Sequence, residues 1–450
     1  MKGLRGSRGW FGCRPRSAGN PLAIVCAALS SRLTLGDGPS QMGDDPPHRP
    51  ELTCIVGAGA SVPFGGPSTR ALTKSVAANL NTLRPRGGEA PFAPRVDMLI
   101  LAAERYYGYD ELTFEQLLDL FEGVDALYSG WCQGNIPTIA EACVTKPLDE
   151  LGDIFDPMFI APCASSLIRT VRDDVARAST VAPGHGHWAV CRDFWHRLAD
   201  EFTLTVATLN YDTLIEQALG LDGRHQGLEP IQGENTWRLH PRSLARHDQH
   251  RLFHIHGSIH LGRREYGTDV NRFAYEDSFH ELYWHPSPEA AGRTIWGSSS
   301  PFSQSGRMLR GLPIVTGLHK PDKLLVEPLA SYYLETANQL ARSPRVLVVG
   351  YGFADSHINV LLGRLNKFHG ASRRIAVIDL VDLVLEHGSS ERSGMLTMLA
   401  KWAEETRLDI GYPHPGQSAN GCVRWYWNGL IDVAQHSMDK MVGFLNESRQ

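Results

Sequence analysis

The chain has 450 residues, of which 42% are hydrophobic and 21% charged, so it can bury a sizeable core and is long enough for two or three domains. Its formal net charge of -5 gives no electrostatic reason to expect nucleic acid or an anionic membrane surface as the main partner. No apolar run approaches the ~20 residues of a membrane span, and none of the eight cysteines form a C-x-x-C pair, which indicates reduced cysteines in a cytoplasmic protein.

The first stretch with a clear pattern is a short apolar run that leads into glycines. Residues 1–50 are rich in Gly, Arg and Pro, and we expect a disordered tail or an over-long gene start at which Met42 is the true first residue. The run Leu52–Val56 predicts a strand, and Gly57–Ser61 follows it directly. Glycines in this place let the backbone approach a phosphate and leave free amides facing it. A plain tight turn is the alternative, because the usual dinucleotide fingerprint has a third glycine where this chain has Val62.

A long helical stretch comes next. A helix is expected to begin near Ser68, and apolar residues three and four apart around residues 98–121 predict further helices. We therefore expect a helical insertion over residues 96–199, inside an α/β domain formed by residues 51–95 and 200–450.

A second strand with a polar end lies at Leu204–Leu209. Thr213 and Glu216 are spaced as a capping box, so a helix is expected to start there. Asn210 and Asp212 would then lie at the carboxyl end of a strand, which is where ligands bind in open α/β sheets. The alternative is that both side chains only cap the helix.

A histidine pair follows in the run Arg251–Leu261. His254 and His256 are two apart on an expected strand, hence on one face, and Gly257 ends that strand. Such a pair can hold a metal, but no third ligand with suitable spacing is evident, so no metal site is predicted. A single histidine at a strand end can instead act as a general base, since its unperturbed pKa is ~6.5, and we favour this role for His256.

The remaining strands complete an α/β pattern. Residues 262–320 predict a loop-rich insertion that can close over a ligand. A strand over Arg345–Val349 is expected to end at Gly350, with Asp355 capping a helix over residues 357–365. Another strand is expected to end at Asp379, either a turn residue or an acceptor for ribose hydroxyls. Strands that each feed a turn and a helix predict a Rossmann-like parallel sheet with helices on both faces.

Four motifs in order resemble a known family. They are GAGAS at 57–61, TLNYD at 208–212, HGS at 256–258 and GYGFADSHIN at 350–359. In this order they resemble the sirtuin-like (silent information regulator) superfamily, and within it the branch of bacterial anti-phage defence proteins that destroy NAD. The resemblance implies three groups of site residues: catalytic Asn210, Asp212 and His256; a pyrophosphate turn of Gly57, Ala58, Gly59 and Ser61; and a second nucleotide loop with Gly350 and Tyr351. Phe114 and Glu115 resemble a further element of the defence branch.

The resemblance also implies an activity. It implies a cytoplasmic NAD hydrolase that releases nicotinamide and ADP-ribose in anti-phage defence, uses NAD as substrate without a metal, and works as a homo-oligomer or with a partner ATPase or sensor protein. Two departures count against a peptide deacylase: no paired cysteines follow His256, and Gly66–Arg70 stands where deacylating sirtuins have an Asp-Phe-Arg loop. An NAD-dependent protein deacylase remains one alternative, and a non-catalytic module that senses NAD or ADP-ribose remains another.

Overall fold

The computed structural model describes residues 49–84, 96–98, 100–101, 104, 112–132, 157–246, 249–262, 281–293, 314–316, 320–380, 390–405 and 414–447. Residues Arg49–Gln450 form one compact unit. Residues 1–48 of the expected tail at 1–50 and most of the expected loop-rich insertion at 262–320 lie outside the described residues. The division of the rest into an α/β domain and a helical insertion stays a prediction.

The centre of this unit is a seven-stranded sheet. Its strand order is β10-β11-β9-β8-β1-β2-β5, and every neighbouring pair is parallel except β10 with β11. The register pairs Glu51 with Thr203 and Val56 with Thr208, so β1 and β2 end level with each other. The strands are β1 (Glu51–Val56), β2 (Thr203–Thr208), β5 (Arg251–His254), β8 (Arg345–Val349), β9 (Arg374–Ile378), β10 (Gly416–Gln417) and β11 (Val423–Tyr426).

The path of the chain through the sheet determines where a ligand fits. The chain runs outward from β1 through β2 to β5, then returns to β8 on the other side of β1 and runs outward again through β9 to β11. Numbered along the chain, the parallel strands have the 3-2-1-4-5-6 order of doubly wound dinucleotide-binding folds. The predicted Rossmann-like sheet is therefore confirmed. The direction of winding reverses between β1 and β8, and a crevice opens at such a point beyond the carboxyl ends of the strands.

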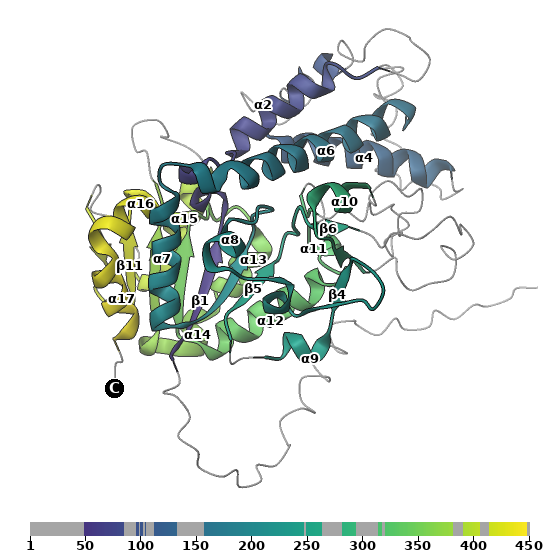
Figure 1. Cartoon of the computed structure of the whole chain (residues 1–450). Coiled ribbons are helices and arrows are strands. Elements are labelled where there is room, and N and C mark those ends of the chain that lie inside the picture. Colours follow the sequence, from purple (N-terminus) through teal and green to yellow (C-terminus); the bar gives the residue numbers. More distant parts are fainter. Residues whose placement is uncertain are drawn as a thin grey trace, which may run out of the picture. The chain divides into compact units, whose positions relative to one another are not determined.

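Helices cover both faces of the sheet (Figure 1). Alternate residues of each strand point to opposite faces, so Ile55 of β1 packs in one core and its neighbour Cys54 packs in the other. Burying an aliphatic side chain of this size stabilises the fold by about 1.5–3 kcal/mol. One face is covered by α12 (Leu329–Arg342), α13 (Ser356–Leu362), α14 (Leu365–His369) and α15 (Ser390–Ala403), and the other by α7 (Trp188–Glu201), α8 (Leu214–Leu219), α16 (Gly429–Asp432) and α17 (Met438–Asn446).

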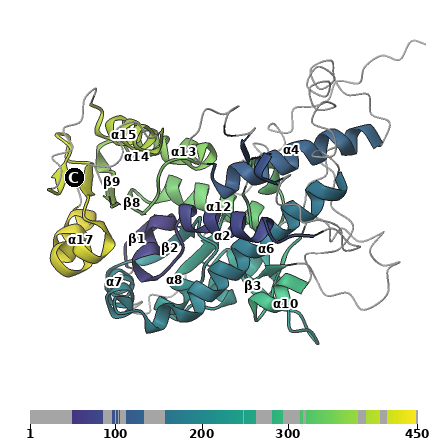
Figure 2. The ribbon, with the colours of Figure 1, turned by 90° about the horizontal axis from the view of Figure 1, so that it is seen from above.

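A third core is built from helices near the carboxyl edge of the sheet. The helices α2 (Thr69–Leu80), α4 (Phe114–Cys132) and α6 (Pro157–Val181) pack against one another (Figures 1 and 2). Tyr211 and Ile259, which follow β2 and β5, join this core, so the helices are anchored to the strand ends. None of the helices in the described part of the chain is both long and apolar enough to span a membrane.

A small antiparallel sheet completes the described structure. Its strand order is β3-β4-β7-β6, with β3 (Leu228–Pro230), β4 (Trp237–Leu239), β6 (Leu261–Gly262) and β7 (Tyr283–Trp284). Three further short α-helices are α9 (Pro241–Leu244), α10 (Pro288–Arg293) and α11 (Lys320–Lys323). The helix predicted over residues 357–365 is in fact two helices, since α13 ends at Leu362 and α14 begins at Leu365.

Candidate functional site

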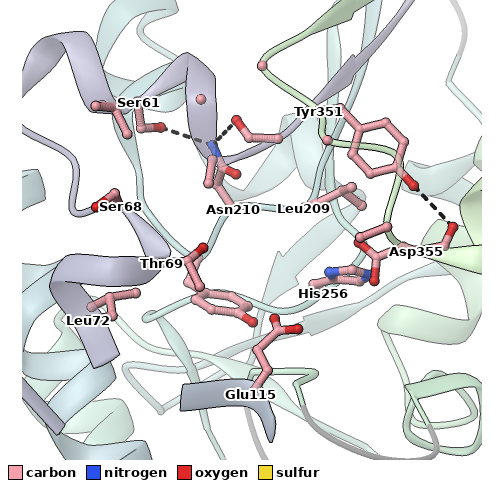
Figure 3. Close-up of a pocket in the computed structure, with 18 of the residues that line it drawn as sticks. Ser61, Ser68, Thr69, Leu72, Glu115, Leu209, Asn210, His256, Tyr351 and Asp355 are labelled. Carbon is pink, nitrogen blue, oxygen red and sulfur yellow. Dashed lines mark hydrogen bonds between the residues drawn. The ribbon is translucent and has the colours of Figure 1, made fainter. Parts of the chain in front are cut away.

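A cavity of about 690 Å³ lies at the carboxyl edge of the large sheet (Figure 3). This volume is within the range of small-molecule and cofactor sites. The turns after β1, β2 and β8, together with α2 and α4, contribute to its wall. All ten site residues expected from the sequence line it: Gly57, Ala58, Gly59, Ser61, Asn210, Asp212, His256, Gly350, Tyr351 and Asp379. Phe114 and Glu115 of α4 line it as well.

The glycine turn after β1 lies directly against the turn after β8. A Cβ atom on Gly57 would lie 2.5 Å from the carbonyl oxygen of Gly350, and a Cβ atom on Gly59 would lie 2.9 Å from the Cα of Gly350. Gly350 itself has a φ of 59°, in the left-handed region. Glycine is therefore needed at these positions for the two backbones to touch.

The same contact corrects one expectation about the turn. The Gly57 amide donates to Val349 O at 2.9 Å and the Gly59 amide to Gly350 O at 3.0 Å, so neither is free to face a phosphate. Within the described residues, Ala58 has the one amide of residues 57–61 for which the structure gives no backbone acceptor. The glycines can contribute close approach of the backbone to a ligand, while the free amides that were predicted are reduced to one.

Asn210 is held by the glycine turn. Its Nδ2 donates to Gly57 O at 3.0 Å and to Ser61 Oγ at 2.9 Å, and Ser61 Oγ donates to Asp212 Oδ2 at 2.7 Å. Both hydrogens of the Asn210 side-chain amide are thus bonded inside the protein. The side-chain oxygen, Oδ1, is the atom left to contact a ligand (Figure 3). Burial raises the pKa of Asp212, opposed by the hydrogen bonds from Ser61 and the Leu214 amide.

The capping box predicted at the start of α8 does not form. The side chain of Thr213 makes no capping bond, and Asp212 Oδ1 accepts from the Leu214 amide at 3.1 Å instead. Glu216 reaches away from the helix start, and its Oε1 lies 2.6 Å from His254 Nε2. The prediction failed because Glu216 has a partner, His254, on strand β5.

His254 contacts the backbone of the turn that carries Asn210. Its Nδ1 lies 3.2 Å from the backbone oxygen of Asn210 and its Nε2 faces Glu216. Both ring nitrogens face oxygen atoms, an arrangement that favours the doubly protonated ring. Burial alone would lower the pKa of His254, but the charge and hydrogen bond of Glu216 and the Asn210 carbonyl raise it above its ordinary value.

His256 lies apart from His254, so the two do not share one strand face as expected. The strand β5 ends at His254, and His256 sits in the following turn, where it lines the cavity. Its Nε2 lies 2.9 Å from Nε2 of His357. Burial lowers the pKa of His256 to about 3, although Asp355 opposes this shift, so the ring is neutral near pH 7.

A charged cluster that the sequence did not reveal closes this side of the cavity. Lys320 Nζ donates to Asp355 Oδ1 at 2.8 Å and to Glu115 Oε2 at 3.0 Å, and all three residues line the cavity. Burial disfavours the charged lysine, but the two carboxylates raise its pKa far above the ordinary value. Asp355 stands before α13 without capping it, because its carboxylate is engaged by Lys320. The DSHIN motif was a signal for Asp355 and the resemblance was a signal for Glu115, but none joined the two residues, and nothing marked Lys320.

Three side chains come close enough to share a cation. His256, Asp355 and His357 each offer one atom, and these atoms lie within 4.8 Å of one another. Two of them already bond to each other, and the third is paired with Lys320. A cation would have to displace both interactions.

Tyr351 and Asp379 lie at the cavity with their polar atoms bonded within the protein. The Tyr351 hydroxyl donates to Asp355 O and contacts Asn359 Oδ1, both at 3.0 Å, so this side chain braces the loop that follows β8. Asp379 directly follows β9, and its Oδ1 accepts from the Leu380 amide at 2.8 Å. Its role toward a ribose stays a prediction.

Comparisons with known proteins give one family match. The family model described as "SIR2-like domain" matches residues 204–390, which include Asn210, His256 and Asp379. No curated protein matches the chain. Similar solved structures include two complexes of mutant Sir2 homologues with ADP-ribose, each 11% identical, covering 88% of this chain and 91% of theirs at a TM-score of 0.35. A structure described under the mechanism and regulation of Sir2 enzymes is 12% identical, covering 88% and 93% at a TM-score of 0.29.

These structural likenesses are weak and carry no argument. The fold is assigned from the strand order, and the family match comes from the sequence. Residues 204–390 are similar to SIR2-like domains, and this match supports the sirtuin-like superfamily.

Proposed function

We propose that this protein binds NAD in the cavity and hydrolyses the bond between nicotinamide and ribose, giving nicotinamide and ADP-ribose. The observation that carries the proposal is that Asn210 and His256, delivered by separate strand ends, line one cavity at the winding reversal of a doubly wound sheet. The SIR2-like match contains both residues and supports NAD as the ligand.

The chemistry requires positioning more than strong acid or base. Positive charge develops on the ribose as neutral nicotinamide leaves with the bonding electron pair. The oxygen of a water molecule then bonds to C1′, and one of its protons must be removed. In this proposal the side-chain oxygen of Asn210 orients the water and the ribose hydroxyls, and His256 takes the proton that the water loses.

The electrostatic state of His256 suits this task. Its depressed pKa keeps a lone pair available at every pH above about 3. A base this weak is sufficient here, since the attacked carbon is already electron-poor in an oxocarbenium-like transition state. The buried His254, whose Nδ1 lies 3.2 Å from the backbone oxygen of Asn210, holds the turn that presents the side-chain amide.

The test is an NAD-cleavage assay. The purified protein is incubated with NAD and nicotinamide is followed by chromatography. Asn210→Ala and His256→Ala are each expected to lower the rate ~10²-fold or more, the usual scale for a positioned catalytic group. Asn338→Ala, which removes an exposed amide on α12, serves as the control and should leave the rate unchanged. If both site variants cleave as fast as the parent, the assignment of roles is wrong.

Two other outcomes separate the alternatives. Nicotinamide release that requires an acylated peptide would indicate a deacylase. The sequence argues against this, because Cys422 is the only cysteine after His256 and a paired-cysteine module is impossible there. Saturable NAD binding without any product would indicate a sensing module.

The biological setting is part of the proposal. Destruction of the cytoplasmic NAD pool fits an anti-phage role, and such an enzyme must be silent until infection. We propose that assembly into a homo-oligomer, or a partner ATPase or sensor protein, releases the activity. Measuring the specific rate over a range of protein concentrations tests the first route, and adding candidate partners tests the second.

A further inference from the structure

The contact between His256 and His357 constrains where their protons sit. The two Nε2 atoms are 2.9 Å apart, the ring centroids are 5.1 Å apart and the planes are tilted by 40°. Two neutral imidazoles can make this bond only if one Nε2 carries a proton and the other carries a lone pair. The bond therefore links the tautomer of His256 to that of His357.

The tautomer of His256 decides whether its Nδ1 carries a lone pair or a proton. With its proton on Nε2, His256 donates to His357 and keeps a lone pair on Nδ1, which is then a base. With its proton on Nδ1, it accepts from His357 and can only donate toward the cavity. Only the first arrangement provides the base that the proposed function requires, so the following inference rests on that function.

His357 is well placed to impose one arrangement. It belongs to α13, whose Ile358 and Leu362 are fully buried in the core against the sheet. The hydroxyl of Tyr333 donates to the backbone oxygen of His357 at 3.1 Å, and the two rings lie 6.1 Å apart. A ring on a rigid helix fixes its partner far better than solvent would.

Asp355 lies within 4.8 Å of both rings, but no hydrogen bond joins it to either ring in the described part of the chain. Asp355, the acid closest to the pair, is engaged by Lys320, and Lys320 is also bound to Glu115. Neither ring of the pair is bonded to a carboxylate by any interaction recorded for the described residues, in contrast to His254 with Glu216. The low pKa values of His256 and His357, both caused first by burial, agree with a neutral pair.

We propose that His357 is a positioning residue, which accepts a hydrogen bond from the Nε2 proton of His256 and thereby leaves Nδ1, the other ring nitrogen of this cavity-lining residue, as the base. In the reaction, the water proton goes to Nδ1 of His256. The resulting imidazolium is stabilised by the same bond, because His357 Nε2 accepts its other proton.

Kinetics of two variants test this role. His357→Phe removes the acceptor, and His357→Gln replaces it with an amide oxygen. We expect His357→Phe to lower kcat for NAD cleavage at least 10-fold while KM changes less than about 2-fold, since the ring does not touch substrate. His357→Gln should recover several-fold of that loss, and His436→Gln, an exposed histidine outside the cavity, should behave as the parent. Equal rates for His357→Phe and parent, or equally slow Phe and Gln variants, would overturn the proposal.

A second measurement does not depend on turnover. Long-range proton–nitrogen NMR spectra of protein labelled at histidine distinguish the two tautomers, with His256→Asn used for assignment. The proposal expects the proton of His256 on Nε2 in the parent and a mixed population in His357→Phe. A proton on Nδ1 in the parent, or no change in the variant, contradicts it. If the parent cleaves no NAD, the proposed function fails, while the spectra still decide the hydrogen bond.

Discussion

Ser61 and Asp212 are joined by a hydrogen bond of 2.7 Å between Oγ and Oδ2, across 151 residues of sequence. The same hydroxyl accepts from Asn210 Nδ2 at 2.9 Å. One serine therefore ties the glycine turn after β1 to the turn that carries Asn210 and Asp212. The position of the Asn210 amide depends on a residue that has no need to touch a substrate carbon.

Ser61→Ala should misplace Asn210. The change removes an acceptor for the amide and the donor to the buried Asp212, which should lower kcat for NAD cleavage about 10-fold, the equivalent of about 1.4 kcal/mol in the barrier. Steady-state kinetics measure this. Ser372→Ala, which removes an exposed hydroxyl bonded to His369 O, is the control. A Ser61→Ala enzyme with the parent's kcat would show that the network does not orient Asn210.

Gly59→Ala should force apart the turn at Gly57–Ser61 and the turn at Gly350. Its Cβ would lie 2.9 Å from Gly350 Cα, and overpacking of this kind costs about 1–3 kcal/mol of stability. NAD affinity should fall as well, measured by calorimetry beside a denaturant titration. Gly443→Ala in α17 is the matched control, because nothing lies within 4 Å of the added atom and a helical alanine is favoured over glycine. Equal stability for the two variants would contradict the contact.

His254→Ala should destabilise the fold strongly. It leaves the largely buried Glu216 Oε1 with only the Gln226 amide, at 3.5 Å, and breaking a buried pair from one side costs about 3–5 kcal/mol. Urea unfolding measures the loss. Glu216→Gln is the milder comparison, because an amide oxygen can still accept from Nε2. If Glu216→Gln is as stable as the parent, the charge on the pair is not what matters.

The same pair predicts a pH dependence of stability. The pKa of His254 is raised above its ordinary value of 6.5 in the folded protein. The folded state therefore holds the proton more tightly, so the contribution of the pair is fully present below pH 6.5 and is lost as the pH rises through the raised pKa. The difference in unfolding free energy between parent and His254→Ala should shrink over that range. A constant difference would show that the pKa of His254 is not raised by folding.

Asp119 also predicts that stability depends on pH, but here the buried group destabilises the fold when it ionises. Burial, and secondarily Glu122, raise its pKa from 3.8 to about 7, and its Oδ1 has no hydrogen-bond partner among the described residues. The unfolded chain ionises first, so the penalty for Asp119 appears as the pH rises from about 4 and is complete above about 7. Asp119→Asn should therefore stabilise the protein at pH 8 and make little difference at pH 4, as measured by thermal unfolding. Asp193→Asn on the exposed part of α7 controls for the removal of a charge. Equal stabilisation at both pH values would contradict the raised pKa.

Removal of metals should leave NAD cleavage unchanged. The atoms of His256, Asp355 and His357 that could meet at a cation are bonded to each other or to Lys320. The measurement is the cleavage rate after dialysis against EDTA, together with the metal content of the purified protein. A loss of rate that Zn²⁺ restores would place a metal among these three side chains.

The parts of the fold that follow from local pattern were predictable from sequence. The apolar run at Val346–Val349 and its equivalents at the other parallel strands each gave a buried strand, because such runs bury both faces of a parallel strand. The polar residues after these strands were expected at one edge, and they line one cavity. Their roles in catalysis stay predictions.

The parts that depend on distant partners were not predictable. Glu216 was expected to complete a capping box, but it pairs with His254, which lies 38 residues away in sequence. Asp355 was expected to cap α13, but Lys320 engages it from a segment whose pattern gave no signal. In each case a polar residue suited to a local bond found a stronger, charge-assisted one after the chain had folded.

The backbone-to-backbone contact between the Gly57–Ser61 turn and Gly350 limits how this cavity can diversify. A wall made of main chain offers no side chains to exchange, and it tolerates no added atoms. Relatives that accept a different ligand are therefore expected to differ in the cavity-lining side chains of α2 and α4.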